Sequence, residues 1–257
     1  MPFPLEICID SLESARTAGP YLGPGDRFEV CASLLAGGGL TPSMGLVRAL
    51  RADQPHIGLM VMVRPRPGSF VYTPAEVEVM LLDIQAAREA GAVGVVFGCL
   101  TVEGEVDTAV TTQLCKAAEG MEVTFHRAFD VTPSWQRACD TLASIPGITR
   151  ILTSGHALTA LEGAAELDAL TRHLQSSSSS FPLTILPASG INAMSLAELR
   201  NRAPLLQEAH LSASGIIPPP DASAVAIGKV LGFGSGEEWR LDGDKLKAVR
   251  ELVDREG

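Results

Sequence analysis

The chain has 257 residues, of which 46% are hydrophobic and 19% charged, and its formal net charge is -10 at pH 7. This composition excludes a disordered chain, and the negative charge argues against a nucleic-acid partner because phosphates would be repelled. Apolar runs such as 94–100 are too short to cross a membrane, and Glu6 and Asp10 stand where a signal peptide would be apolar. Five scattered cysteines without a CxxC pair indicate reduced thiols, so we expect a globular, cytoplasmic protein.

Short apolar runs separated by segments of helical length predict β-strands along the whole chain. The predicted strands are residues 5–10, 27–32, 58–64, 94–99, 122–127, 148–153, 183–188 and 208–213. Thr-Pro at 41–42, 73–74 and 132–133 predicts helix starts, because threonine caps free N–H groups and proline suits the first turn. At the second of these, Thr73 and Glu76 form a capping box.

This alternation of strands and helices predicts an α/β protein with a (β/α)8 TIM barrel, because right-handed βαβ connections make successive strands parallel. A doubly wound sheet would need a glycine-rich turn after the first strand, which the sequence lacks. We expect a single barrel domain over residues 1–214. Residues 215–257, with prolines at 218–220, are predicted as an irregular extension packed on the barrel that ends in a helix near 242–255. The serine-rich segment 175–180 is predicted as a linker.

The alternation of side chains along each strand predicts which of them face the barrel lumen. The lumen-facing set is polar or contains sulfur: Glu6, Cys8, Asp10, Glu29, Cys31, Met60, Met62, Arg64, Thr124, His126, His210 and Ser212. Barrel centres normally hold Val, Ile and Leu, and each buried polar group without a partner costs about 1–3 kcal/mol. The set therefore indicates either a closed structural ion-pair network or a functional site.

A metal site is one interpretation, because several of these groups lie late in their strands, where barrels of this type hold their active sites. Thiolate, thioether and imidazole suit Cu(I) and Zn²⁺ better than Mg²⁺ or Ca²⁺. The candidate metal ligands are Cys8, Cys31, Met62 and His126. Each cysteine or methionine alone is more often a core residue than a ligand.

An anion site is the other interpretation. The seventh and eighth strands run into Ala-Ser-Gly turns, where many barrels bind phosphate through backbone N–H groups, although a tight turn alone would also need the glycine. The anion-binding candidates are Arg64, Arg66, Ser189, Gly190, Ser214 and Gly215. An enzyme acting by acid–base chemistry on a small anionic or phosphorylated metabolite would use His126, Asp130, Glu29 and Arg64 as catalytic residues.

Several motifs resemble the CutC family of copper homeostasis proteins. The most specific are HRAFD at 126–130, RPR followed by FVY within 64–72, and GGLTPSMG at 38–45, and the likeness runs from Leu5 to Ser214. The resemblance implies a (β/α)8 barrel that binds Cu(I) through Cys8 and Cys31. The chain departs from the family's pattern in its loops, at Pro67, Ser69 and His156.

The resemblance favours a cytoplasmic copper homeostasis protein that captures Cu(I) at the mouth of the barrel. The acid–base enzyme acting on a small anion is the alternative, and a barrel without chemistry is a third reading. We also expect a homo-oligomer, for which the proline-rich tail and Trp239 are interface candidates.

Overall fold

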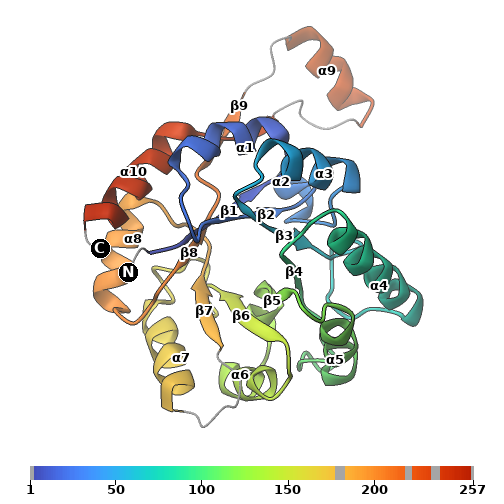
Figure 1. Cartoon of the computed structure of the whole chain (residues 1–257), viewed down its shortest axis with the longest axis vertical. Coiled ribbons are helices and arrows are strands. Elements are labelled where there is room, and N and C mark those ends of the chain that lie inside the picture. Colours follow the sequence, from blue (N-terminus) through green and yellow to red (C-terminus); the bar gives the residue numbers. More distant parts are fainter. Residues whose placement is uncertain (1–2, 177–182, 218–221, 233–237, 256–257) are drawn as a thin grey trace.

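A computed structural model describes residues 3–176, 183–217, 222–232 and 238–255 (Figure 1). In these residues eight parallel strands form a nearly closed barrel in the order β7-β6-β5-β4-β3-β2-β1-β8. The strands are β1 (Leu5–Ile9), β2 (Arg27–Val30), β3 (Gly58–Met62), β4 (Gly94–Phe97), β5 (Glu122–Phe125), β6 (Ile148–Thr153), β7 (Thr184–Pro187) and β8 (Ala209–Leu211). β7 and β8 contact each other but share no backbone ladder in the described residues. The predicted TIM barrel and all eight predicted strands are confirmed.

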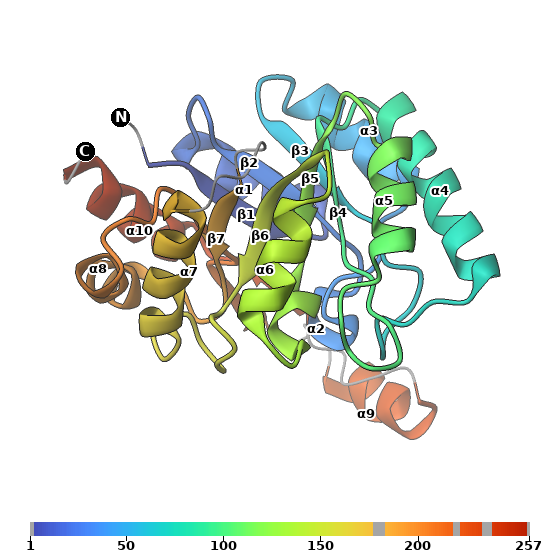
Figure 2. The same ribbon diagram turned by 90° about the horizontal axis from the view of Figure 1, so that it is seen from below.

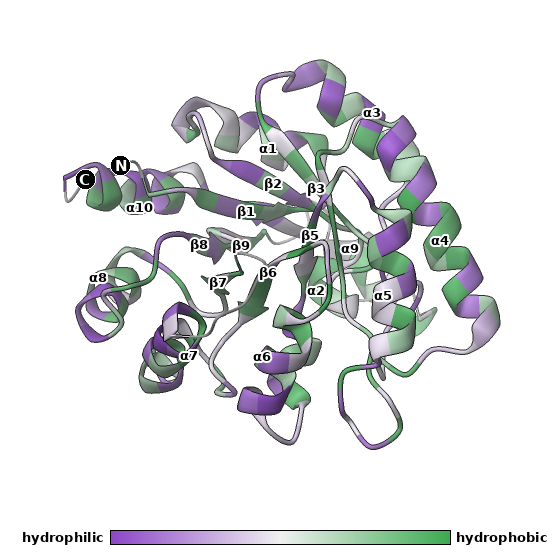
Figure 3. Cartoon of the chain, turned by 60° about the horizontal axis from the view of Figure 1, so that its bottom comes forward, coloured by the Kyte–Doolittle hydropathy of each residue, from purple (hydrophilic) through white to green (hydrophobic). Residues whose placement is uncertain are grey.

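A ring of helices surrounds the strands, and Figure 3 shows hydrophilic residues on it, for example on α3, α7 and α8. The barrel helices are α1 (Leu12–Ala18), α3 (Met44–Asp53), α4 (Pro74–Glu89), α5 (Thr108–Ala117), α6 (Trp135–Ala143), α7 (Ala164–Ser176), α8 (Ala193–Arg202) and α10 (Gly243–Arg255). Shorter turns lie in the loops: α2 (Leu34–Gly37) and the 3₁₀ helices η1 (Gly19–Tyr21) and η2 (Arg127–Val131). No helix in the described ranges is long and apolar enough to cross a membrane.

Only one of the three predicted threonine caps is correct. Thr73 caps α4 and completes the predicted capping box, but α3 and α6 begin two residues later than predicted, at caps formed by Ser43 and Ser134. In both of those cases the chain reads Thr-Pro-Ser, and the serine hydroxyl accepts the N–H three residues on. The threonines bond elsewhere: Thr41 accepts from a backbone N–H of the third βα loop, and Thr132 donates to a carbonyl of η2.

The C-terminal helix α10 completes the ring of barrel helices. It packs between α8 and α1 (Figure 1) and buries Leu246, Val249 and Val253. β8 and α10 therefore form the eighth βα unit, and the elements β9 (Ser214–Ile217), α9 (Ala222–Val230) and β10 (Glu238–Leu241) are inserted between them. Figure 2 shows α9 away from the strands of the barrel. From the sequence alone α10 is predicted to belong to an extension, because the inserted segment separates it from β8 along the chain.

The other predictions for residues 175–180 and 215–257 can be compared with the structure only where these residues are described. β9 and β10 pair as an antiparallel hairpin, and the predicted terminal helix near 242–255 is present as α10. Most of the predicted linker 175–180 and the prolines 218–220 lie outside the described residues.

Two apolar layers follow the predicted alternation. Outward residues such as Ile7, Phe28 and Val61 belong to one large core shared with the helices. The lumen holds separate small clusters, one with Cys31, Met60, Met62 and Val96, and another with Leu152, Leu186 and Ala188. The polar groups predicted to face the lumen are therefore kept apart from the main core.

Candidate functional site

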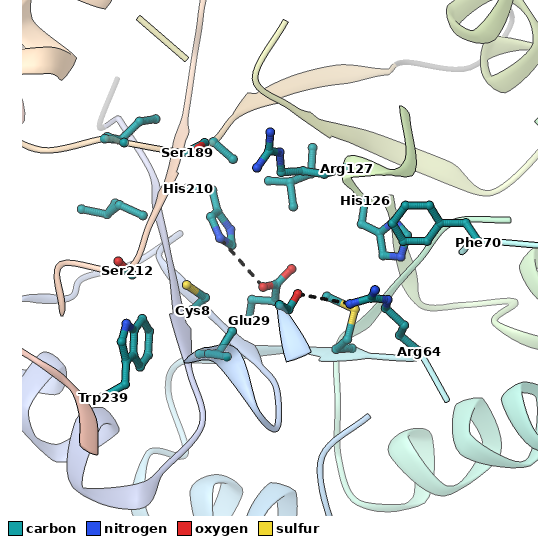
Figure 4. Close-up of a pocket in the computed structure, with 18 residues that line it drawn as sticks. Cys8, Glu29, Arg64, Phe70, His126, Arg127, Ser189, His210, Ser212 and Trp239 are labelled. Atoms are coloured by element: carbon teal, nitrogen blue, oxygen red, sulfur yellow. Dashed lines mark hydrogen bonds and ion pairs between the residues drawn. The ribbon is translucent and has the colours of Figure 1, made fainter. Parts of the chain in front are cut away.

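A cavity of about 440 Å³ lies at the C-terminal ends of the strands (Figure 4). Figure 4 shows Cys8, Glu29 and His210 close together, and Arg64, Phe70 and His126 grouped apart from them. The predicted site residues that line the cavity are Cys8, Glu29, Met62, Arg64, His126, Ser189 and Gly190. Strands β1, β2, β3 and β8 thus contribute to one site, together with the residues that follow β5 and β7.

A buried ion-pair network beneath the cavity fixes the His210 ring. Glu6 stands opposite both Arg27 and His210 in the strand register, and it accepts hydrogen bonds from Arg27 Nε at 2.6 Å and His210 Nδ1 at 2.8 Å. Burial alone would raise the pKa of Glu6, but the Arg27 guanidinium and His210 lower it from 4.5 to about 2. Arg27 also pairs with Glu208 at 2.6 Å, which continues the network across the barrel. Glu6 is therefore a carboxylate that holds the Nδ1 proton of His210.

Next to this network, Cys8, Glu29 and His210 form a candidate metal cluster. One ligand atom of each, including the Cys8 thiol and a ring nitrogen of His210, lies within 4.8 Å of the others, and all three residues are buried. Because Nδ1 of His210 is engaged by Glu6, its Nε2 is the nitrogen that faces Glu29, at 3.8 Å from Oε2. Burial alone would lower the pKa of His210, but Glu29 and Cys8 raise it well above 6.5. A metal ion would have to displace this proton and that of the thiol.

Cys31 lies against Glu29 and does not line the cavity. Its Sγ donates to Glu29 Oε2 at 3.4 Å, whereas Glu29 Oε1 is buried without a hydrogen-bond partner. Burial and the nearby carboxylate raise the pKa of the Cys31 thiol well above 9.0. Gly39 packs on this thiol so closely that a Cβ there would lie 3.3 Å from Sγ and 3.5 Å from the Met62 methyl. Both sulfur groups are thus close to the cluster, packed against one loop.

The His126 ring is a hydrogen-bond donor toward the cavity. The backbone N–H of Ala128 donates to Nδ1 at 3.2 Å, so the proton of the neutral ring is on Nε2. Burial, aided by the positive charge of Arg64, lowers the pKa of His126 to about 3, so the ring is neutral at pH 7. Nε2 is buried and has no partner in the described protein. In this tautomer Nε2 offers neither a lone pair to a metal nor a base for proton abstraction.

The guanidinium of Arg64 is a buried cation surrounded by carbonyl groups. It donates to Gly37 O at 2.7 Å, Gly39 O at 3.1 Å and Gly68 O at 3.3 Å, and its central carbon lies 5.1 Å from the Phe70 ring centroid. Among the described residues no carboxylate lies within 4.0 Å of it. Arg64 therefore holds the loops at the mouth together and leaves its positive charge uncompensated.

Several other predicted site residues have structural partners and do not line the cavity. Arg66 pairs with Glu76 at the start of α4. Asp130 accepts hydrogen bonds from Arg127 and from both the backbone and the hydroxyl of Ser154, which ties the β5 and β6 loops together. Arg66, predicted to bind an anion, and Asp130, predicted to transfer protons, are therefore both engaged in ion pairs.

The two Ala-Ser-Gly turns also differ from the predicted phosphate site. Ser214 and Gly215 belong to β9 and pair with β10, outside the cavity. Ser189 lines the cavity, but its hydroxyl donates to Leu158 O. The first turn of α8 is capped by its own Asn192, whose side chain accepts two backbone N–H groups.

Arg27 and Phe70 were not selected from the sequence, whereas His210 was predicted only to face the lumen and Trp239 only as an interface candidate. Arg27 and His210 share the lumen-facing parity of their strands, and the register opposite Glu6 would have grouped them. Phe70 comes from the loop after β3, and Trp239 reaches the cavity from β10. No local pattern identifies these two, because loops and insertions carry no periodicity.

Comparisons with known proteins agree with this architecture. The model of the CutC family matches residues 3–215. The CutC family protein of Sinorhizobium medicae is 39% identical over 250 residues, covering 97% of this chain and 96% of the relative. The crystal structure of CutC from Streptococcus agalactiae, named for a proposed role in copper homeostasis, has a TM-score of 0.71 and 30% identity over 82% of this chain and 98% of that one. A monomeric dihydrodipicolinate synthase variant, 15% identical with a TM-score of 0.55 over 99% of this chain and 79% of its own, shares the fold alone. Because the family model spans the strands that build the cavity and relatives match over nearly their whole length, this chain belongs to the CutC family.

Proposed function

We propose that this protein is a copper homeostasis protein that binds Cu(I) at the mouth of its barrel. The observation that carries the proposal is the approach of Cys8, Glu29 and His210 ligand atoms to within 4.8 Å of one another beside the cavity. The name of the Streptococcus agalactiae relative supports copper as the metal. The donor chemistry also supports it, since thiolate and imidazole both suit copper.

The residues around the cluster fit a thiophilic ion. Glu6 fixes the tautomer of His210, an arrangement in which a carboxylate orients a histidine ligand. Cys31 and Met62 offer sulfur close by, and Cys31 is the second thiol that the family resemblance implies. The tautomer of His126 argues against the predicted role of this residue as an auxiliary ligand. We therefore assign Cys8 and His210 as the principal ligands, with Cys31 as the adjacent thiol.

Competition with a chromogenic Cu(I) chelator, without oxygen and with a reductant present, tests this proposal. Cys8→Ser is expected to weaken Cu(I) binding by roughly 100-fold or more, because even outer partners of metal ligands contribute about 10–100-fold. Cys139→Ser is the matched control, since Cys139 is also a buried free thiol but lies on α6, in the outer core between the strands and the helices. Equal affinities for the wild type and Cys8→Ser would refute the proposal.

We also propose that the protein works in the cytoplasm as a homo-oligomer. All five cysteines are free in the structure, as expected for a reducing compartment. Ile227, Val230 and Leu231, at the end of α9, are 62%, 86% and 62% exposed, which supports burial of this helix against another copy. Sedimentation equilibrium of the wild type beside Val230→Glu tests the assembly, and a monomer in the wild type would contradict it.

A further inference from the structure

We infer that the side of the cavity formed by Arg64, Phe70 and His126 binds the carboxylate of a small monocarboxylic acid, whose apolar body lies across the cavity. This carboxylate site lies in the same cavity as Cys8, Glu29 and His210 but is formed by other residues, and it requires no bound metal. Two buried polar groups on this side lack a partner in the described residues: His126 Nε2–H has no hydrogen-bond acceptor, and Arg64 has no carboxylate within 4.0 Å.

The first unmatched group is the Nε2–H of His126. The residue is 4% exposed, and Nε2 lacks a hydrogen-bond partner in the described protein. Because the backbone of Ala128 fixes the tautomer, the ring presents a donor and no acceptor at this position. A buried donor without a partner destabilises the protein by about 1–3 kcal/mol. A ligand acceptor that enters the cavity would remove this penalty, and the ring is already oriented to donate to it.

The second unmatched group is the charge of Arg64. The residue is 8% exposed, its guanidinium donates to the carbonyl oxygens of Gly37, Gly39 and Gly68, and within the part of the chain that the structure describes no carboxylate pairs with it. A buried cation without a counter-charge is costly, whereas a carboxylate brought beside it would be strongly attracted. Arg127, the other arginine of the lining, is already paired with Asp130 at 2.7 Å. The cavity therefore offers one uncompensated positive charge, which suits a monoanion.

Phe70 brings these two groups to the same place. Its ring centroid lies 5.1 Å from the guanidinium carbon of Arg64 and 5.0 Å from the His126 ring centroid. Figure 4 shows all three side chains together at one side of the cavity, apart from Cys8 and His210. One carboxylate between them can accept from His126 and neutralise Arg64 at the same time.

The rest of the cavity favours an organic body over a phosphate group. Apart from the metal cluster, its lining is largely apolar and includes Leu34, Leu152, Ala188, Ile191, Leu211 and Trp239. Its volume of about 440 Å³ is in the range of small-molecule sites, about 300–1,000 Å³. The turns that hold phosphate in other barrels are engaged here, at Ser189 with Leu158 and at Ser214 within the β9–β10 hairpin. A short acyl chain therefore matches the cavity better than a sugar phosphate.

Titration of metal-free protein with sodium hexanoate tests the inference. Trp239 lines the cavity, and a Trp135→Phe background leaves it as the sole tryptophan fluorophore, because the chain has two tryptophans. Hexanoate is expected to change this fluorescence saturably, whereas 1-hexanol and hexylamine bind at least about tenfold more weakly, since they lack the negative charge. Inorganic phosphate at equal ionic strength is expected not to displace hexanoate. Binding of hexanol as tight as that of hexanoate, no hexanoate binding at all, or displacement by phosphate would overturn the inference.

Variants assign the carboxylate to its partners. His126→Asn keeps an acceptor for the Ala128 N–H but removes the donor at the Nε2 position, and Arg64→Gln removes the charge. Each is expected to weaken hexanoate binding at least about tenfold, which corresponds to about 1.4 kcal/mol. Arg66→Gln is the matched control, because Arg66 lies in the same loop but pairs with Glu76 outside the cavity. Should Arg64→Gln fail to fold, His126→Asn and the ligand series decide the question alone. The assignment would be refuted if His126→Asn bound hexanoate as tightly as the wild type, or if Arg66→Gln weakened hexanoate binding as much as Arg64→Gln.

Since the hexanoate titrations use metal-free protein, their outcome is independent of the Cu(I) titration.

Discussion

Replacing Glu6 by glutamine removes the charge on which the network below the site depends. Glu6 is fully buried and accepts from Arg27 Nε at 2.6 Å and from His210 Nδ1 at 2.8 Å. Glutamine has nearly the same volume, so packing changes little. Arg27 keeps its pair with Glu208 but loses half of its counter-charge, and His210 loses the carboxylate that orients its ring.

The expected loss of stability is a few kcal/mol. The pKa of Glu6 is lowered from 4.5 to about 2 in the folded protein, and a shift of that size corresponds to about 3 kcal/mol. Removing one partner of a buried ion pair costs about 3–5 kcal/mol in other proteins, which is consistent. Because the folded pKa lies below the unfolded one, this stabilisation is present above pH 4.5 and is lost as the pH falls toward 2.

Urea unfolding of metal-free wild type and Glu6→Gln, at pH 7 and at steps down to pH 3, measures this contribution. At pH 7 the variant is expected to be less stable by about 3 kcal/mol, and the difference narrows as the pH falls below 4.5. Glu78→Gln, a change on the exposed face of α4, is the control and should shift stability by less than about 0.5 kcal/mol. A difference at pH 7 below about 1 kcal/mol, or one that does not depend on pH, would refute this reasoning.

Three further predictions concern the site and the barrel. Gly98→Ala is expected to destabilise the protein by about 1–3 kcal/mol and to weaken hexanoate binding, because the new Cβ would lie 2.5 Å from His126 Nδ1. Unfolding and hexanoate-binding curves equal to those of the wild type would contradict this. Leu246→Ala should cost about 2–5 kcal/mol in urea unfolding if α10 is the eighth barrel helix, and less than about 1 kcal/mol if it is a loose extension. Cu(I) affinity should rise between pH 6 and pH 8, by up to about tenfold per pH unit for each proton that the metal displaces. The reason is that burial raises the pKa of Cys8, and the neighbours of His210 raise the pKa of that residue. Chelator competition at three pH values measures this, and an affinity that does not change with pH would show that neither residue is a ligand.

Local patterns in the sequence were sufficient for the barrel and for the location of the site. The period of two along each strand separates residues such as Ile7 from residues such as Cys8, because one face packs on helices and the other faces the lumen. The convergence at the mouth follows as well, because parallel strands bring their C-terminal ends to one side of the barrel. Cys8, Arg64 and His126 were assigned to the mouth for this reason, and all three line the cavity.

The chemistry of the site was beyond the reach of local patterns, because it depends on pairs of atoms that the closed barrel brings together. Glu6 and His210 are 204 residues apart, and their hydrogen bond decides which nitrogen of His210 can meet a metal. One backbone N–H in η2 makes His126 a donor, so the residue that the sequence proposed as a ligand or base can be neither in this tautomer. Periodicity reports only which face a side chain occupies, whereas the partner of each buried polar atom is determined by strand register and loop conformation over a few ångströms.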